Sequence, residues 1–381
     1  MQYRNFGRMG WKVSALGFGC MRLPTTGEYA NIDEPEAIRM LHYAIDHGVN
    51  YVDTAYGYHG GNSERLLAKA LRGGYREKVK LATKLPPPLV ETAADFDRLL
   101  NEQLSKLQTE HIDVYLLHGL RASRWEQLRQ LDVLGWADGA MADGRIGCLG
   151  FSFHDSTEVL RQIVDAYDNW AMCQVQYNFM DVNRQAGTEG VRYAASKGLA
   201  VVVMEPLLGG RLVNPPKAVR EVWDAAGADR TPVEWALQWL WDQPEISVVL
   251  SGMSTMQQVR ENVESASRSG VRHLTDEERE VVARAREAYQ GLTQVPCTGC
   301  EYCMPCPQGV NIPRNFRIYN EGYMYNQADE ARRNYARMAE EERASLCAQC
   351  RQCEDLCPQN IEISQWLPKV EAVLGQGEPY S

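Results

Sequence analysis

The sequence lacks the features that mark membrane, secreted and nucleic-acid-binding proteins. None of its apolar runs reaches the roughly 18 residues that a membrane-spanning helix needs. It has no basic run and no finger-type spacing, and its formal net charge is −10, so we expect no nucleic-acid partner. Its first residues, MQYRNFGRMGWKVS, contain no apolar core like that of a signal peptide. We therefore expect a cytoplasmic protein that does not bind a membrane.

Cysteine is scarce over most of the chain. Cys20, Cys148 and Cys173 are the only cysteines in the first 296 residues, and their apolar surroundings predict plain core residues. The other cysteines all lie between Cys297 and Cys357. In a reducing cytoplasm, cysteines gathered in this way bind metal more often than they form disulfides.

The first part of the chain alternates short apolar runs with amphipathic patterns. The apolar runs have the length and β-branched content of buried parallel strands, and they lie at 13–19, 49–53, 79–84, 112–118, 146–152, 172–177, 199–205 and 246–252. This alternation predicts a closed (β/α)8 TIM barrel over residues 1–290. A doubly wound open sheet is the alternative, but GFGCMR lacks the third glycine of the G-x-G-x-x-G turn. The composition changes at Pro296, so we expect a second, smaller domain over residues 291–381.

Four titratable residues stand at or just after the ends of successive predicted strands. Asp53 and Tyr58 follow the second strand, Lys84 ends the third and His118 ends the fourth. The carboxyl ends of barrel strands carry the chemistry, so these side chains are expected to converge on one mouth. Singly, each has a simpler explanation, namely a capping aspartate, a loop tyrosine, a snorkelling lysine and a structural histidine. Their joint register favours a catalytic group.

The chemistry of these four residues is coherent. A free tyrosine has a pKa of about 10 and donates protons poorly at neutral pH. A nearby Lys84 cation is expected to lower the pKa of Tyr58, and Asp53 to hold that lysine charged. His118 can donate a hydrogen bond to a carbonyl oxygen. The set predicts a general acid that protonates the alkoxide formed when a hydride reaches a carbonyl carbon.

Four short motifs follow one another in this part of the chain: LGFGCMRLP, DTAYGYHGGNSE, LATK and IDVYLLH. In their order and spacing, the sequence resembles the aldo/keto reductases. The resemblance implies a TIM barrel and hydride transfer between a nicotinamide dinucleotide and a carbonyl or alcohol substrate. It carries over Tyr58 as the proton donor, Lys84 and Asp53 as the residues that tune it, and His118 as the residue that orients the substrate carbonyl.

The resemblance also implies a dinucleotide site built from GFSF, CQVQYN, MEPLLGGRL and LSGMSTMQQVREN. The residues that it assigns to this site are Ser152, Gln174, Met204, Pro206, Leu207, Gly209, Gly252, Met253, Ser254, Gln258, Glu261 and Asn262. Many NADPH-preferring relatives place a lysine and an arginine where this chain has Gly252 and Gln258, and those cations would pair with the 2′-phosphate. Ser254, Thr255 or Arg260 can substitute for them, so NADP is favoured over NAD, although Ser254 is equally explained as a helix cap.

The second domain contains two cysteine runs, each followed by a proline. A fourth cysteine displaced by its proline serves the other cluster in two-cluster ferredoxins. We therefore predict two [4Fe-4S] clusters in a small, mainly helical, ferredoxin-like domain, and the tail resembles that of a ferredoxin-bearing branch of the aldo/keto reductases. Cluster 1 takes Cys297, Cys300, Cys303 and Cys357, and cluster 2 takes Cys347, Cys350, Cys353 and Cys306. Two structural zinc sites are the alternative, but zinc ribbons usually pair two separated CxxC knuckles.

Clusters alone do not establish electron flow, because a hydride carries two electrons and each cluster exchanges one. In the first hypothesis the chain reduces carbonyls, and the clusters stabilise the small second domain. In the second, the chain is a redox-relay subunit that passes electrons between NAD(P)H, the clusters and an electron-transfer protein. In a third, the barrel is only a protein-binding scaffold and has no affinity for dinucleotide. The substrate itself is not predicted.

Overall fold

The computed structural model describes residues 1–380. Its contacts divide the chain into two compact units, Met1–Leu208 with Glu234–Thr275, and Gly209–Val233 with the residues from Asp276 onward. The predicted boundary between residues 290 and 291 differs from this division, because the segment after residue 208 and the helix from Asp276 pack with the second unit.

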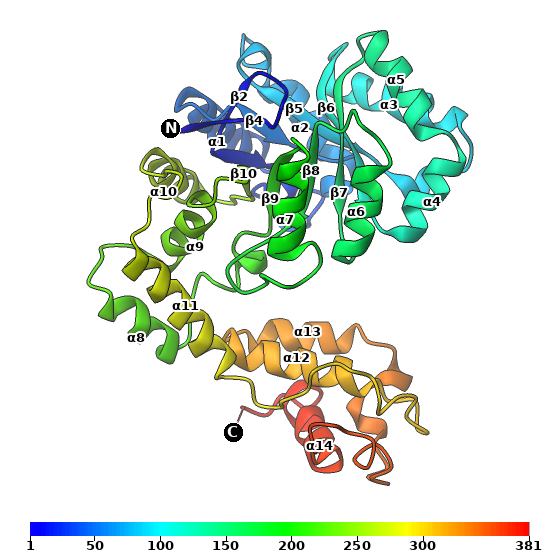
Figure 1. The fold of residues 1–381 in the computed structure, drawn as a ribbon, viewed down its shortest axis with the longest axis vertical. Coiled ribbons are helices and arrows are strands. Elements are labelled where there is room, and N and C mark those ends of the chain that lie inside the picture. The colour runs from blue at the N-terminus through cyan, green and yellow to red at the C-terminus, as the bar shows by residue number, and fades with distance from the viewer. Residues whose placement is uncertain (381) are drawn as a thin grey trace. The chain divides into compact units, whose positions relative to one another are not determined.

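The first unit is a closed barrel of eight parallel strands in the order β10-β3-β4-β5-β6-β7-β8-β9 (Figure 1). The strands are β3 (Leu16–Gly19), β4 (Tyr51–Asp53), β5 (Lys80–Leu85), β6 (Ile112–Leu120), β7 (Ile146–Phe153), β8 (Met172–Gln176), β9 (Ala200–Met204) and β10 (Ile246–Ser251). Each predicted apolar run supplies one of these strands, which confirms the TIM-barrel prediction.

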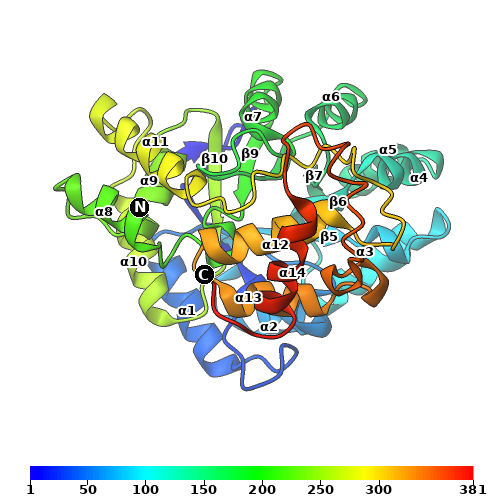
Figure 2. The same cartoon turned by 90° about the horizontal axis from the view of Figure 1, so that it is seen from below.

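Helices lie outside the strands, as Figures 1 and 2 show. They are α1 (Glu34–Asp46), α2 (Asn62–Ala70), α3 (Ala94–Leu107), α4 (Ala122–Gln130), α5 (Val133–Ala142), α6 (Thr157–Asp165), α7 (Gly187–Ser196), α9 (Pro232–Trp241) and α10 (Met256–Ser267). Local sequence sets their ends. In α1, the Asp33 side chain accepts a hydrogen bond from the Glu36 N–H, and Gly48 follows the helix with a φ of 95°.

The amino end of the barrel is closed by a hairpin that the sequence did not predict. The run 13–19 was expected to form one strand, but β2 (Lys12–Ser14) pairs antiparallel with β1 (Tyr3–Asn5) before β3 begins. Phe6 and Val13 join the apolar cluster inside the barrel, and Trp11 stacks on Phe6 with ring centres 4.1 Å apart. The hairpin thus covers the amino end of the barrel interior, and barrel enzymes carry their chemistry at the carboxyl ends of the strands.

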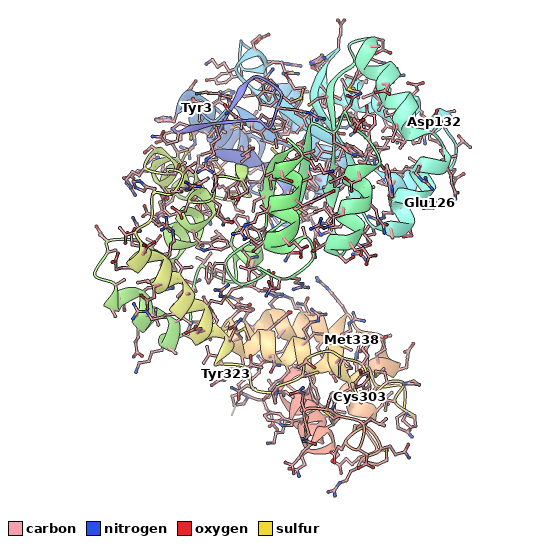
Figure 3. All side chains as sticks on the ribbon, in the orientation of Figure 1. Tyr3, Glu126, Asp132, Cys303, Tyr323 and Met338 are labelled. Carbon is pink, nitrogen blue, oxygen red and sulfur yellow. The ribbon has the colours of Figure 1, made fainter. Side chains whose placement is uncertain are left out.

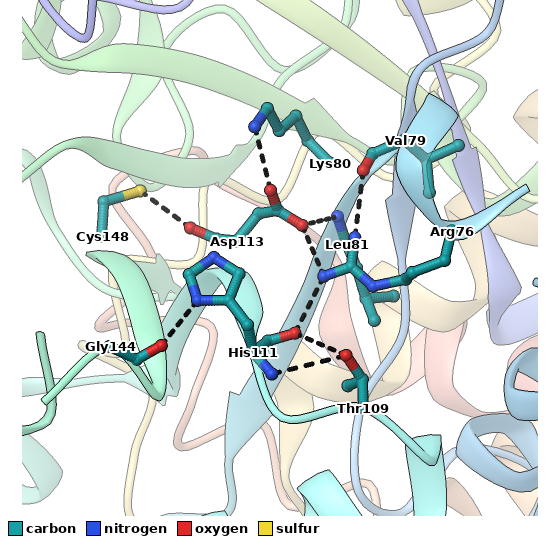
Figure 4. Close-up of polar contacts among 9 residues, drawn as sticks. All are labelled: Arg76, Val79, Lys80, Leu81, Thr109, His111, Asp113, Gly144 and Cys148. Atoms are coloured by element: carbon teal, nitrogen blue, oxygen red, sulfur yellow. Dashed lines mark hydrogen bonds and ion pairs between the residues drawn. The ribbon is translucent and has the colours of Figure 1, made fainter. Parts of the chain in front are cut away.

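Asp113 ties β5 to β6 at the amino end (Figure 4). Its carboxylate pairs with Arg76 at 2.8 Å and Lys80 at 3.0 Å, and it accepts the Leu81 N–H at 3.1 Å. Burial alone would raise the pKa of Asp113, but these three partners hold it below the usual value. We interpret the network as structural, because residues at the amino ends of barrel strands serve stability rather than catalysis.

The second unit is mainly helical, as predicted, with α8 (Lys217–Ala225), α11 (Asp276–Gln290), α12 (Ile312–Met324), α13 (Ala328–Ala336) and α14 (Ile363–Leu374). Helix α8 packs on α11. The buried core between the last three helices includes Phe316, Tyr335 and Val370. Figure 3 labels Cys303 on the loop before α12 and Met338 just after α13.

Arg211 explains why the segment after β9 groups with the second unit. Its guanidinium pairs with Glu321 on α12 at 3.1 Å and with Glu330 on α13 at 2.8 Å. All three side chains are at least partly buried, so screening by solvent is reduced. The segment is thereby fixed to the helices that follow it by about a hundred residues in the sequence.

Two further predictions concern buried and apolar residues. Cys20, Cys148 and Cys173 are buried, which confirms them as core residues. Among residues 1–380, no helix combines the length and the apolar character that crossing a bilayer requires.

Candidate active site

The strand register brings three of the four predicted catalytic residues to one end of the barrel. Asp53 is the last residue of β4 and pairs with Ala82 on β5. Lys84 lies two residues further along β5 and pairs with Leu116 on β6. His118 lies on β6, two residues beyond Leu116. Alternate residues of a strand face the same side, so this register directs the side chains to a common mouth.

Lys84 is the centre of this group. Its Nζ donates to Asp53 Oδ1 at 2.7 Å and lies 3.4 Å from the Tyr58 hydroxyl. The Lys84 and Asp53 side chains are only 1% and 3% exposed. A third bond, from Nζ to the Thr54 carbonyl oxygen at 2.6 Å, was not predicted, because a backbone acceptor leaves no mark in the sequence.

The ion pair keeps Lys84 charged. Burial alone would lower the pKa of Lys84, but Asp53 and Tyr58 raise it, and the net shift is upward. The ammonium is therefore present beside the Tyr58 hydroxyl throughout the neutral range.

The expectation that this ammonium leaves Tyr58 with a lowered pKa is wrong. Burial raises the pKa of the Tyr58 phenol, Lys84 lowers it and Asp53 raises it again, so the net pKa lies above the usual value. Lys84 lowers the pKa of Tyr58, as expected, but burial and Asp53 together raise it by more. Tyr58 is consequently protonated at neutral pH, and its proton is available for donation to an oxygen that becomes negatively charged.

His118 faces Tyr58 edge-on, with ring centres 6.2 Å apart and an interplanar angle of 80°. The sequence placed His118 at the end of its strand, but β6 runs on to Leu120 and its pairing with β7 is irregular between Leu117 and Leu120. Burial, assisted by nearby Lys84 and His154, lowers the pKa of His118 to about 3. The imidazole is therefore neutral, and a neutral imidazole can donate a hydrogen bond without being a cationic acid.

The neutral state of His118 predicts a pH dependence of stability. The unfolded chain binds a proton at this residue below pH 6.5, whereas the folded barrel does so only near pH 3. The part of the unfolding free energy that comes from neutral His118 is therefore fully present above pH 6.5 and decreases as the pH drops toward 3. Between pH 7 and pH 5, the wild type should lose about 2 kcal/mol more unfolding free energy than His118→Asn. Chemical denaturation at both pH values measures the two losses of unfolding free energy. Substitution of the exposed His47, in His47→Asn, is the control. Equal losses in wild type and His118→Asn would contradict the prediction.

Ser152 and Gln174 are cross-strand neighbours on β7 and β8. Both side chains are buried, and Gln174 Oε1 has no hydrogen-bond partner among the described residues. Ser152 Oγ accepts the Gly119 N–H at 2.7 Å, which leaves its own hydroxyl hydrogen to donate. A buried acceptor beside a hydroxyl donor matches a primary carboxamide, whose NH2 group can donate to the acceptor and whose carbonyl oxygen can accept from the hydroxyl. These residues therefore fit the nicotinamide group.

The remaining predicted dinucleotide residues divide into three groups. Met204 ends β9, and Pro206 and Leu207 follow it in the same unit, whereas Gly209 begins the segment that groups with the second unit. The second group, Gly252, Met253 and Ser254, links β10 to α10. The third lies on α10 and comprises Gln258, Glu261 and Asn262.

Several of the side chains in the last two groups already have protein partners. Asn262 donates to Ser251 Oγ at 3.1 Å, and Glu261 accepts from Gln257 at 2.8 Å. Gln258 Oε1 accepts the Ser254 N–H at 2.8 Å. The residue that caps α10 is Thr255, not Ser254, so the simple capping explanation of Ser254 is wrong.

The eight clustered cysteines come together in two groups within the second unit. One pocket is lined by the four thiols assigned to cluster 1, by the polar residues Thr298, Glu301 and Gln359, and by apolar residues that include Phe316 and Ile363. The four thiols are Cys297, Cys300, Cys303 and Cys357. Burial raises the pKa of Cys303 to about 11, and the other three thiols add to this rise. A cationic centre that binds all four as thiolates would relieve their mutual repulsion.

The second group is the one assigned to cluster 2, and the pKa shifts of Cys347 and Cys353 indicate which thiols lie near them. Burial raises the pKa of Cys347, as do Cys306 and Cys350, and the pKa of Cys353 is raised by burial and by Cys303 and Cys306. Thiols of both runs therefore influence the second run, and the crossed assignment of Cys306 stays a prediction. A site for a single metal ion needs at least three His, Cys, Asp or Glu side chains close together. Residues 1–380 contain no such group.

A model of the aldo/keto reductase family matches residues 15–280, which is most of the chain. The chain belongs to the aldo/keto reductase family. A model of 4Fe-4S dicluster domains matches residues 296–362, so this aldo/keto reductase carries an iron–sulfur domain of ferredoxin type.

Relatives of this aldo/keto reductase include named oxidoreductases. A 6-dehydroglucose reductase of Novosphingobium aromaticivorans is 29% identical over 285 residues, covering 69% of this chain and 90% of that protein. An L-galactose dehydrogenase of Arabidopsis thaliana is 28% identical over 286 residues, covering 69% and 87%. The aldo-keto reductase AKR11C1 from Bacillus halodurans, in its holo form, is 27% identical with a TM-score of 0.63, covering 75% of this chain and 96% of that one.

Sequence reasoning missed a buried polar network behind Lys84 of this aldo/keto reductase. Gln103 on α3 donates to Glu64 Oε1 at 2.7 Å and to the Lys84 carbonyl oxygen at 3.1 Å. Thr83 also donates to Glu64, and Tyr115 donates to Gln103. The network fixes the backbone from which Lys84 projects. The available signal was a glutamate and a glutamine at apolar-face positions of helices α2 and α3.

Two buried asparagines on α12 were missed as well. The Asn320 side chain accepts the Val295 N–H at 2.9 Å and donates to the Val295 carbonyl at 2.7 Å, just ahead of Cys297. Asn315 accepts the Ala344 N–H at 3.0 Å, just ahead of Cys347. One helix therefore positions the segments that enter both cysteine runs. In the sequence, these two asparagines could be found only as polar residues at positions of α12 that otherwise carry apolar side chains.

Proposed function

We propose that this aldo/keto reductase transfers a hydride between a nicotinamide dinucleotide and a carbonyl or alcohol substrate. The observation that carries the proposal is the buried Lys84–Asp53 pair against the Tyr58 hydroxyl, with neutral His118 beside it. The names of the two relatives, a sugar reductase and a sugar dehydrogenase, point to polar carbonyl or alcohol substrates.

The chain's own residues account for the acid–base part of the reaction. His118, as a neutral donor, orients the carbonyl oxygen and shares its developing negative charge. Tyr58 then transfers its phenolic proton to that oxygen. Lys84 stabilises the phenolate that Tyr58 becomes, and Asp53 and the Thr54 carbonyl keep the ammonium in place. In alcohol oxidation the same proton returns to Tyr58.

The dinucleotide, when bound, supplies or accepts the hydride. Ser152 and Gln174 are the residues proposed to hold its carboxamide, because they offer a buried donor and an unpaired buried acceptor. Met204, Pro206 and Leu207 after β9, together with the link from β10 to α10, are proposed to hold the remainder. Barrels often bind phosphate at loops after these last two strands.

The second unit is proposed to hold two [4Fe-4S] clusters with crossed ligation. The donor sets fit, because each provides four cysteine thiols, and the first set lines one pocket together with polar and apolar residues. Bound clusters supply one-electron chemistry. We assign them a stabilising role during turnover, since cysteines of both runs pack against the core of this small helical domain.

Paired cysteine substitutions distinguish crossed from uncrossed ligation. Under crossed ligation, Cys357→Ala with Cys300→Ala damages one cluster and leaves about four iron atoms per chain. Cys357→Ala with Cys350→Ala damages both and leaves almost none. Iron and sulfide analysis after anaerobic purification measures the difference, with buried Cys173→Ala as the control that keeps full iron. If the two double variants exchanged these iron contents, the crossed assignment would be wrong.

Anaerobic mixing tests the proposed function itself. The holoprotein should oxidise NADPH or NADH only when a carbonyl substrate from a panel of aldehydes, ketones and oxidised sugars is present, and its cluster absorbance should stay constant. Rapid bleaching of the clusters by the dinucleotide alone would contradict the proposal and favour the redox relay. Absence of dinucleotide binding would favour a scaffold.

A further inference from the structure

Arg22 lies beside the link between β10 and α10, although the two are far apart in the sequence. It ends the short turn that follows β3, the barrel neighbour of β10. Ser254 Oγ donates a hydrogen bond to the Arg22 carbonyl oxygen at 2.7 Å. The first and last strands of the barrel thus bring Arg22 to the segment that resembles an adenosine-phosphate site.

Gly252 provides the space for the Arg22 side chain. A Cβ atom at residue 252 would lie 3.0 Å from Arg22 Cβ and 2.8 Å from Arg22 Cγ, which is closer than real side chains approach. Its backbone does not adopt a positive φ, so space and not conformation explains the glycine. A lysine or any other side chain at residue 252 would have to displace the Arg22 stem.

The Arg22 guanidinium has no partner within residues 1–380: it is exposed and makes no hydrogen bond, ion pair or ring contact there. The other cation near this segment is committed elsewhere, since the Arg260 guanidinium lies 5.5 Å from the centre of the Tyr43 ring. Gln258 uses its side chain to accept the Ser254 N–H. Arg22 therefore presents an unpaired cation beside this segment.

We propose that Arg22 binds the 2′-phosphate of NADP and thereby makes the chain prefer NADP over NAD. The inference rests on the proposed function, since it takes a dinucleotide to bind at this end of the barrel. Gly252, where many NADPH-preferring relatives place a lysine, makes room for the Arg22 side chain, which comes from another strand. A guanidinium presents several N–H donors in a planar fork that suits phosphate oxygens, and it stays charged at any physiological pH.

Arg22→Gln tests the proposal by binding rather than by turnover. Dissociation constants are measured on the anaerobically purified holoprotein for NADPH, NADH, adenosine 2′,5′-bisphosphate and adenosine 5′-monophosphate. The variant should bind NADPH and the bisphosphate about 10- to 100-fold more weakly, and NADH and the monophosphate within about two-fold of wild type. Arg22→Lys should keep part of the preference, because it retains the charge but not the fork.

The control is Arg129→Gln, which removes an exposed cation on α4 that pairs with Glu126 at 2.9 Å and should leave the preference unchanged. Retained NADH affinity also shows that Arg22→Gln is folded. If NADPH and NADH weakened equally, or if wild type did not distinguish them, the inference would be overturned while the proposed function stood. If wild type bound neither dinucleotide, the proposed function would fail first.

Discussion

Replacing Tyr58 with phenylalanine is expected to reduce carbonyl turnover by about 10³-fold, since a positioned general acid typically contributes 10²- to 10⁴-fold. The change removes one oxygen and the proton it carries, and leaves the Lys84–Asp53 pair in place. The dissociation constant for the dinucleotide should change by no more than about two-fold, because the proposed carboxamide contacts are on other strands. Single-turnover rates and equilibrium titrations measure the two effects.

Tyr56→Phe is the matched control. Tyr56 is two residues away, but its hydroxyl donates to Glu102 on α3 at 2.9 Å and has no contact with Lys84 among the described residues. This variant should keep nearly full activity. If Tyr58→Phe turned over carbonyl substrate as fast as Tyr56→Phe, the assignment of the proton donor would be refuted.

Replacing Lys84 with methionine is expected to have the second largest effect, on both activity and stability. The buried Asp53 carboxylate would lose its cation, and breaking a buried pair by removing one partner typically costs 3–5 kcal/mol. Activity should also fall, because the phenolate formed at Tyr58 would no longer be stabilised by the Lys84 ammonium. Chemical denaturation and turnover measurements give the two losses.

The double variant Lys84→Met with Asp53→Asn separates the two effects. Removing the orphaned charge should restore most of the lost unfolding free energy, since a neutral buried pair avoids the desolvation cost. Activity should not return, because Tyr58 still lacks its ammonium. A double variant less stable than Lys84→Met alone would contradict the account of the pair.

The barrel could be predicted from the sequence because its strands are buried on both faces and read as continuous apolar runs. The division of the first run into β2 and β3 could not, since a short antiparallel hairpin and a barrel strand share the same apolar composition. Residues 209–233 group with the second unit through the packing of α8 on α11 and through the pairs of Arg211 with Glu321 and Glu330. Contacts between such distant positions leave no local pattern.

The candidate site was predictable in its residue types and order, but less so in its energetics. Asp53, Lys84 and His118 follow from strand ends, and the structure brings them together with Tyr58. The raised pKa of Tyr58 was not predictable, because it depends on how far burial outweighs a single ammonium. Arg22 was overlooked because its position beside the last strand arises only when the barrel closes.

Transfer of deuterium tests the central claim most directly. NADPH with deuterium in place of both hydrogens at C4 of the nicotinamide is mixed anaerobically with the holoprotein and a carbonyl substrate, and the alcohol is analysed by mass spectrometry and NMR. The account predicts one deuterium bound to the new carbinol carbon and a proton from solvent on its oxygen. An alcohol whose carbinol carbon carries only solvent hydrogen would contradict direct hydride transfer at this site.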